Sequence, residues 1–144
     1  MIKIQKEDFN LENEINDINT KYPNIGAIST FLGVVRNTNN NQPVNSIDIE
    51  VYEEMAYKTL EKISHKAKKK WDLIDLLIIH RFGNLKIGEK IVLVASFSLH
   101  RKDSFEASSF VMDYLKKDAP FWKKEYYNDK NDKYEWIKNS KLKN

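Results

Sequence analysis

The sequence predicts an α+β fold in which helices flank a mostly antiparallel sheet. Apolar, β-branched runs recur along the chain, and several are separated by short turns, as in β-hairpins. Other segments carry their apolar residues at helical spacing instead. These elements do not alternate in the regular βαβ order that predicts a parallel sheet. The 144 residues, 41% of them hydrophobic, contain no repeat and no break in composition, which predicts one domain over residues 1–144.

The elements of the N-terminal third follow from the local pattern. We expect a short edge strand at 2–5 and a helix over 10–20, where apolar residues recur at helical spacing. The apolar segment 26–35 predicts a buried strand. Residues 36–43 are typical of a polar loop, and alternating apolar and polar residues over 44–53 predict a half-buried strand.

The next segment predicts the clearest helix of the chain. A single apolar stripe is formed by Ala56, Leu60, Ile63, Ala67 and Trp71. Lysines fill the remaining faces. The run Lys66–Lys70 is typical of a solvated helix face, and it is also compatible with nucleic-acid binding.

The C-terminal half predicts more strands and one further helix. Two strongly apolar strands are expected over 73–83 and 89–101. A helix is expected to start at Asp103, which forms a capping box with Glu106, and to run to about Lys117. The segments FWKKEYY and KYEWIK flank a polar turn and predict a C-terminal hairpin or two paired segments.

Composition excludes several classes of function. The formal net charge of +3 and the pI near 8.9 fall short of the basic bias of dedicated nucleic-acid binders. Because cysteine is absent, disulfides, a thiolate nucleophile and a persulfide carrier are excluded. The three histidines are not spaced as a ligand cluster, so no metal site is expected. The polar N-terminus and the lack of any apolar run of about 18 residues predict a cytoplasmic protein without a membrane span.

Arginine usage points to candidate binding residues. Of the 24 cationic side chains only Arg36, Arg81 and Arg101 are arginine. In a chain that otherwise uses lysine, arginine indicates sites that need the planar guanidinium group, which binds phosphate or carboxylate through two parallel bonds. Arg81 and Arg101 each follow a histidine at the end of an apolar run, which favours this interpretation.

Several cations fall at strand ends, where binding sites are usually built. Arg36 ends one predicted strand, His100 and Arg101 end another, and Lys116 and Lys123 follow further along the chain. If these side chains converge, they form a pocket for a small anion, above all phosphate. A lysine placed among other cations also loses its proton more easily and can act as a base or nucleophile. From these residues alone, scattered surface cations are an equal alternative.

Four motifs in a fixed order carry a family resemblance. They are GAISTFLGVVRN at 26–37, IIHRFG at 78–83, HRKDSFEASSFVMDYLK at 100–116 and APFWKKE at 119–125. Together they resemble the large, catalytic subunit of molybdopterin synthase, from about residue 25 to about residue 125. The resemblance implies an α/β-hammerhead type of α+β fold and a sulfurtransferase of molybdenum cofactor biosynthesis.

The resemblance also implies partners and a substrate. Two copies would form a homodimer at the centre of a heterotetramer, with a small ubiquitin-like sulfur-carrier subunit at each end. The C-terminal Gly-Gly tail of that partner would bring sulfur as a thiocarboxylate, so no cofactor of the chain's own is expected. The substrate would be cyclic pyranopterin monophosphate (precursor Z), and the product molybdopterin. A chain without cysteine is consistent with sulfur supplied by a partner.

Site residues can be assigned from the resemblance one by one. The family's substrate-binding residues fall on Val34, Val35, Arg36, His100, Arg101, Lys116, Lys123, Lys124 and Glu125. Lys116 and Lys123 are the two implied catalytic residues. The chain departs from the family at Val34, where relatives commonly carry a polar or cationic residue. It also has Lys138 near the C-terminal position where relatives often have arginine.

Two other functions are compatible with the residues. A small basic RNA-binding module is favoured by the lysine run and by aromatic residues such as Trp122, Tyr126 and Tyr127. The chain could also be a non-catalytic scaffold subunit that binds the partner without turnover. Salt-dependent binding to oligonucleotides would indicate the first, and partner binding without product the second.

Overall fold

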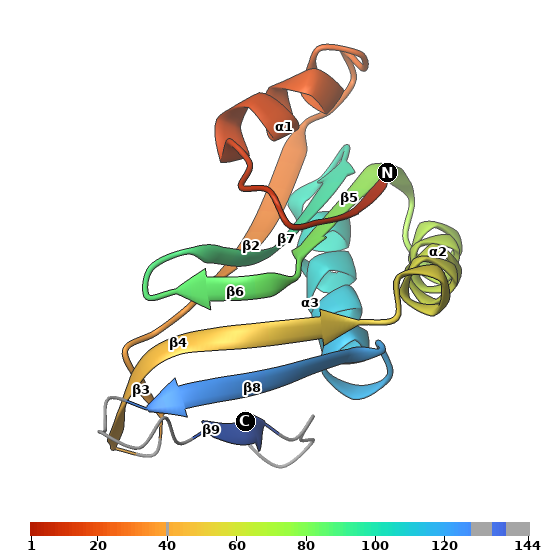
Figure 1. Cartoon of the computed structure of the whole chain (residues 1–144). Coiled ribbons are helices and arrows are strands. Elements are labelled where there is room, and N and C mark those ends of the chain that lie inside the picture. The colour runs from red at the N-terminus through yellow and green to blue at the C-terminus, as the bar shows by residue number, and fades with distance from the viewer. Residues whose placement is uncertain (40, 128–133, 138–144) are drawn as a thin grey trace.

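The computed structural model describes residues 1–39, 41–127 and 134–137 and has an α+β fold, as predicted. The described residues form three helices and nine strands (Figure 1). In chain order these are β1 (Ile2–Gln5), α1 (Leu11–Asn19), β2 (Ala27–Val34), β3 (Thr38–Asn39), β4 (Gln42–Val51), α2 (Glu53–Lys70), β5 (Leu73–Arg81), β6 (Gly83–Lys86), β7 (Lys90–Ser98), α3 (Arg101–Lys117), β8 (Phe121–Tyr127) and β9 (Tyr134–Ile137).

The first sheet has the strand order β1-β5-β7-β2. Its β5–β7 and β7–β2 pairs are antiparallel, and the β1–β5 pair is parallel. β1 lies at one edge, as the sequence predicted, and β2 lies at the other. The central strands β5 and β7 read as continuous apolar runs because both faces of the sheet are covered.

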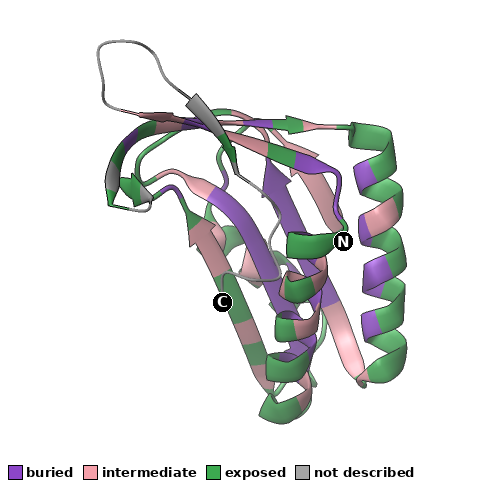
Figure 2. Cartoon of the chain, turned by 90° about the horizontal axis from the view of Figure 1, so that it is seen from below, coloured by how far each residue is buried: buried purple, intermediate pink, exposed green. Residues whose placement is uncertain are grey.

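Helices cover both faces of this first sheet. Leu77 and Ile79 on β5 pack with the apolar side of α1. Their neighbours Leu76 and Ile78 point the other way, into the larger core that α2 and α3 complete. Figure 2 shows the buried residues along the central strands and on the side of α2 that faces them.

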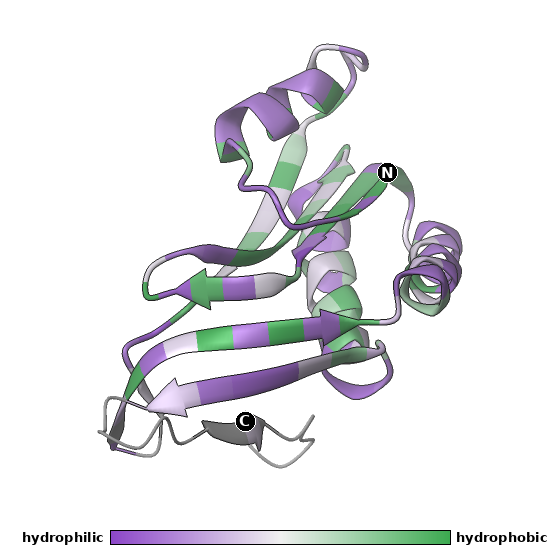
Figure 3. Cartoon of the chain, viewed as in Figure 1, coloured by the Kyte–Doolittle hydropathy of each residue, from purple (hydrophilic) through white to green (hydrophobic). Residues whose placement is uncertain are grey.

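The second sheet extends from β4, which pairs with β6 along one edge and with β8 along the other. β9 pairs antiparallel with β8, so the predicted pairing of the two C-terminal segments is confirmed. The predicted alternation in β4 is also confirmed, with Val44, Ile47 and Ile49 buried. Figure 3 shows this alternation of hydrophilic and hydrophobic residues along the strand.

The predicted stripe of α2 is confirmed, because Ala56, Leu60, Ile63 and Ala67 are all fully buried. The helix ends at the C-cap Trp71, whose indole Nε1 donates a hydrogen bond of 2.8 Å to Glu106 on α3. Among the described residues, no helix is both long and apolar enough to cross a membrane.

The predicted start of α3 was wrong by two residues. The helix begins at Arg101 with His100 as its N-cap, and His100 makes no side-chain capping bond. Asp103 therefore lies in the first turn, and no capping box with Glu106 forms. The chain passes directly from β7 into the helix, and the Ser98 hydroxyl group donates a 2.6 Å bond to the His100 carbonyl at this junction.

Two short strands were missed in the sequence. The segment 36–43, predicted to be a polar loop, contains β3 and the start of β4, paired as a tight hairpin. Asn41 has a φ of 63°, a conformation that asparagine tolerates better than most residues, which allows the turn without an apolar anchor. β6 is the second missed strand and lies almost entirely between the two apolar strands predicted over 73–83 and 89–101.

Candidate functional site

A cavity of about 360 Å³ lies where the first sheet, α3 and β8 meet. Its walls combine apolar side chains with three cationic ones and one histidine. The residues that line it are Phe31, Gly33, Val34, Arg36, His80, Ile91, Val92, Met112, Leu115, Lys116, Phe121 and Lys123. Four residues predicted from the sequence therefore come together here: Val34, Arg36, Lys116 and Lys123.

Arg36 reaches the cavity from the end of β2. Val34, the last residue of that strand, is exposed and lines the same space. Val35 does not line it, because its side chain is buried in the core. Its backbone fixes the chain instead: the Val35 amide donates to Glu89, and the Val35 carbonyl accepts from Gly88. Val35 thus positions Arg36.

Lys116 lies in the last turn of α3, one turn beyond Met112, so both side chains lie on the side of the helix that faces the cavity. Its neighbour Lys117 points elsewhere and lines a separate hollow between α2 and α3. The two adjacent lysines are therefore distinguished by the helix geometry alone.

Lys123 is half-buried on β8, and its position follows from strand alternation. Phe121, Lys123 and Glu125 share the inner face of the strand, since successive side chains point to opposite faces. Burial lowers the pKa of the Lys123 ammonium group, and the charge of Lys116 lowers this pKa further. The Glu125 carboxylate opposes both effects. The two implied catalytic lysines therefore lie close enough to influence each other.

Lys124 and Glu125 were predicted to bind substrate, but neither lines the cavity. Lys124 points to the outer face of β8, where its Nζ lies 4.6 Å from the centre of the Trp136 ring. Glu125 is only 5% exposed and acts on the site through its charge near Lys123. Lys138 lies outside the described residues.

His100 and Arg101 lie at the other end of α3 from Lys116. Both are exposed, and neither lines the cavity. A helical rise of about 1.5 Å per residue places Arg101 roughly 22 Å from Lys116. A single chain therefore does not form the five-cation pocket that the strand-end pattern suggested.

His80 is a cavity residue that the sequence-based assignment missed. It is 4% exposed, lies on β5 and stacks on Phe121 with ring centres 3.7 Å apart. Its Nδ1 atom lies 2.9 Å from the carbonyl oxygen of Arg81. Burial, reinforced by the Lys123 charge, lowers the pKa of His80 to about 3, although the bond to Arg81 opposes this shift. The available signal was a polar residue inside an apolar strand.

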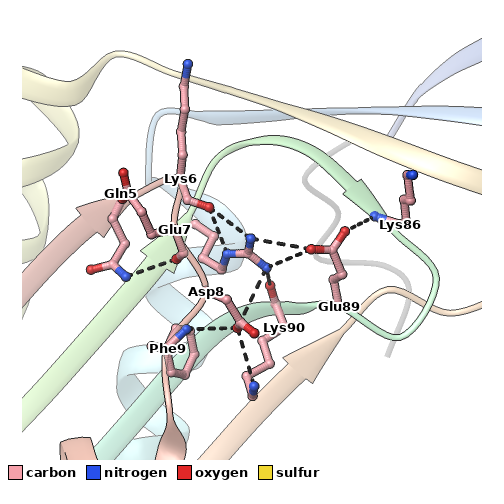
Figure 4. A network of polar contacts seen from close by, with 9 residues as sticks. Gln5, Lys6, Glu7, Asp8, Phe9, Lys86, Glu89 and Lys90 are labelled. Atoms are coloured by element: carbon pink, nitrogen blue, oxygen red, sulfur yellow. Dashed lines mark hydrogen bonds and ion pairs between the residues drawn. The ribbon is translucent and has the colours of Figure 1, made fainter.

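Arg81 does not serve as the anion-binding residue that its type suggested. Its buried guanidinium group donates to the carbonyl oxygens of Lys6 and Lys90, at 2.9–3.1 Å, and forms a 3.4 Å ion pair with Glu89. Figure 4 shows this network, in which the segment after β1 is tied to the start of β7. All these partners belong to the chain itself, so Arg81 supports the structure beside the cavity.

The fold and the cavity define a class: small α+β proteins with a partly apolar, partly cationic cavity between a sheet, a helix and a second sheet. Apolar walls suit a flat ring, and Arg36, Lys116 and Lys123 suit its negative charge.

Comparison with known proteins identifies the family. The model of the family described as MoaE protein matches residues 4–118. The molybdopterin synthase catalytic subunit of Ralstonia nicotianae is 47% identical over 124 residues, which cover 86% of this chain and 70% of that protein. The subunit of the same name from Pseudomonas aeruginosa is 44% identical and covers 86% and 83%, respectively. The chain therefore belongs to the MoaE family.

Solved structures support the same family assignment. The MoaE protein of Burkholderia ambifaria superposes with a TM-score of 0.81 at 42% identity, covering 95% of this chain and 88% of that one. The molybdopterin synthase of Staphylococcus aureus gives a TM-score of 0.85 at 31% identity, covering 94% and 95%. A complex of subunits 1 and 2 of the molybdopterin-converting factor from Helicobacter pylori gives 0.74 at 26% identity, covering 90% and 86%. The enzyme class predicted from the sequence, a molybdopterin synthase catalytic subunit, is confirmed.

Proposed function

We propose that the chain transfers sulfur to cyclic pyranopterin monophosphate and so forms the dithiolene of molybdopterin. The observation that carries this proposal is the convergence of Lys116 and Lys123 at one apolar-walled cavity, beside Arg36. The cavity offers an arginine fork for phosphate and two lysines for proton transfer. The apolar walls offer a surface for the pterin ring.

Lys123 is the lysine best suited to give and take protons. Its lowered pKa is closer to physiological pH, so more of the amine is in the neutral form that a general base requires. Lys116 lines the same cavity and can stabilise the oxyanion that forms at the partner's acyl carbon. Each transfer forms a carbon–sulfur bond on the substrate and breaks a carbon–oxygen bond there. Water then cleaves the bond between sulfur and the acyl carbon, and the partner leaves as a carboxylate.

The sulfur source is the thiocarboxylate at the C-terminus of a small ubiquitin-like partner. No cofactor takes part, and the cysteine-free chain itself cannot carry sulfur. The partner's Gly-Gly tail suits the cavity because glycine lacks a side chain that would block a narrow entrance. We place the reaction in the cytoplasm, where the precursor and the partner would meet.

His100 and Arg101 take part through a homodimer. In one chain they lie roughly 22 Å from Lys116 along α3, too far to contact the same small substrate. Both are exposed and available to a neighbouring molecule. In the homodimer, each protomer therefore supplies His100 and Arg101 to the cavity of the other.

Reconstitution tests the function. Purified chain is mixed with cyclic pyranopterin monophosphate and either the thiocarboxylated or the unmodified partner, and molybdopterin is measured. We expect product only with the thiocarboxylate. Partner binding without product would show a scaffold subunit, and tight, salt-dependent binding to oligonucleotides would favour the RNA-binding alternative. Lys68 and Lys70 of the lysine run already contact Asp75 and Trp71 of the chain itself, which does not favour that alternative.

A further inference from the structure

Among the residues that line the cavity, His80 has a chemical property that the others lack. Arg36, Lys116 and Lys123 can only donate hydrogen bonds in their charged forms. The remaining lining residues are apolar or glycine. While these three groups are charged, His80 is therefore the one lining side chain that offers a nitrogen acceptor to a bound molecule.

The hydrogen bond of His80 fixes which nitrogen is the acceptor. Nδ1 lies 2.9 Å from the carbonyl oxygen of Arg81, and a carbonyl can only accept, so Nδ1 carries the proton. In a neutral imidazole the lone pair is then on Nε2. Within the described residues Nε2 has no hydrogen-bond partner, although the side chain is 4% exposed and lines the cavity.

Two contacts hold the ring in this orientation. One face stacks on Phe121, with ring centres 3.7 Å apart. The carbonyl that anchors Nδ1 belongs to Arg81, whose guanidinium group is itself fixed by Lys6, Lys90 and Glu89. Because the pKa of His80 is low, its ring is neutral in the folded protein near neutral pH, and Nε2 keeps its lone pair as an acceptor.

We propose that His80 is a specificity-determining residue whose Nε2 accepts a hydrogen bond from a ring N–H or amino group of the bound heterocycle. This inference rests on the proposed function, since a pterin carries such donors next to its phosphate-bearing ring. The cationic side chains select for charge, and His80 selects for a donor at one edge of the ring. A similar molecule without that donor would leave a buried acceptor unpaired and bind more weakly.

Two substitutions separate this role from a structural one. His80→Asn places an amide N–H near the position of Nδ1 and so keeps a donor for the Arg81 carbonyl, but it removes the acceptor at Nε2. His80→Gln places an amide oxygen near Nε2 and gives up the bond to Arg81. The exposed His65 provides the control, His65→Gln.

The kcat and the KM for the pterin are measured with the thiocarboxylated partner, and the thermal unfolding midpoint is measured for each variant. We expect His80→Asn to raise KM by roughly tenfold to a hundredfold, the effect of leaving one hydrogen bond unmade. We expect His80→Gln to recover most of this loss, and His65→Gln to match the unsubstituted chain. The reverse order, with His80→Asn active and His80→Gln impaired, would show that only the bond to Arg81 matters and overturn the proposal.

Nitrogen-15 spectra of the histidine rings give a readout that does not depend on turnover. The chain has three histidines, and the His80 signals are those missing from His80→Gln. We expect a protonated Nδ1 and an unprotonated Nε2, with the Nε2 signal shifting when the pterin is added. If the pterin binds and Nε2 does not shift, the inference fails while the proposed function stands. If the unsubstituted chain neither binds the pterin nor turns it over, the proposed function fails.

Discussion

At the scale of single residues, the proposed site depends on two lysines whose surroundings differ. Lys116 is exposed at the end of a helix, and Lys123 is half-buried on a strand. Burial lowers the pKa of Lys123 and the nearby charge of Lys116 lowers it further, which would not happen in a scattered pair of surface lysines. Function at this site therefore follows from position in the fold, since 21 of the 24 cations share the same side chain.

Alanine substitutions test the two lysines against a neighbour. We expect Lys116→Ala and Lys123→Ala each to lower kcat by about a hundredfold or more, the usual range for a positioned acid–base group. Lys117→Ala is the matched control, because Lys117 follows Lys116 in sequence but lines a different hollow. Product formation is assayed with the thiocarboxylated partner. Equal losses in all three folded variants would contradict the assignment.

The buried His80 makes stability depend on pH. Its pKa in the folded chain, about 3, is below the value of about 6.5 in an unfolded chain, so below pH 6.5 the unfolded chain binds a proton that the folded chain does not. The stabilisation is complete above pH 6.5 and is lost as the pH falls toward 3. Between pH 7 and pH 4.5 we expect the unsubstituted chain to lose roughly 2–3 kcal/mol more unfolding free energy than His80→Gln. Urea unfolding at both pH values measures this difference, and parallel pH curves would show that His80 titrates normally.

At the scale of elements, the sequence predicted what periodicity can encode. The stripe on α2 and the alternation in β4 reflect the burial of one face of each element. The apolar runs of β5 and β7 reflect the burial of both faces of the sheet. The start of α3 was missed because Asp103 and Glu106, which have the spacing of a capping box, both lie inside the helix. β6 and β3 were missed because their pairing depends on partners distant in sequence or on backbone bonds alone.

The candidate site was only partly visible for a related reason. Arg36, Lys116 and Lys123 were assigned from motifs, and their convergence needed the packing of β2, α3 and β8. His80 lies inside an apolar strand, where the pattern reports burial but not which cavity a side chain faces. Arg81 carried the strongest compositional signal for anion binding, yet its guanidinium group is occupied by backbone carbonyls.

Arg81 should therefore matter for stability. Arg81→Lys keeps the charge but cannot reach Lys6, Lys90 and Glu89 together, so partly buried carbonyls lose their donors. We expect a decrease of about 2–3 kcal/mol in the free energy of unfolding, measured by urea denaturation. Lys6→Ala is the control, because the acceptor is the Lys6 backbone carbonyl, and it should change stability by no more than about 0.5 kcal/mol. An Arg81→Lys variant as stable as this control would show that the network contributes little.

At the scale of the whole molecule, the distance along α3 makes a prediction about assembly. If each cavity uses Lys123 from one chain and Arg101 from the other, inactive variants at these two positions should complement each other. A mixed dimer of Arg101→Ala and Lys123→Ala contains one cavity with both defects and one with neither. With random mixing in a symmetric dimer, about half of the dimers are mixed, and each of these has one intact cavity of its two. About a quarter of all cavities should then be active, so about a quarter of the original activity should return.

Co-expression with two affinity tags allows the mixed dimer to be isolated and assayed. Each variant mixed only with itself provides the baseline. Activity at that baseline in the purified mixed dimer would place both residues in one chain's site. A complex of one chain and one partner subunit, measured by size, would contradict the dimer itself.

The half-buried Lys123 also has a consequence for laboratory evolution. The fold holds a cation where burial and a second cation both work against its charge, so the native state is less stable than an apolar side chain there would make it. A screen that rewards heat resistance alone would be expected to enrich methionine or leucine at this position early. The surviving variants would be robust proteins without turnover, so any such selection on this scaffold needs an activity step in every round.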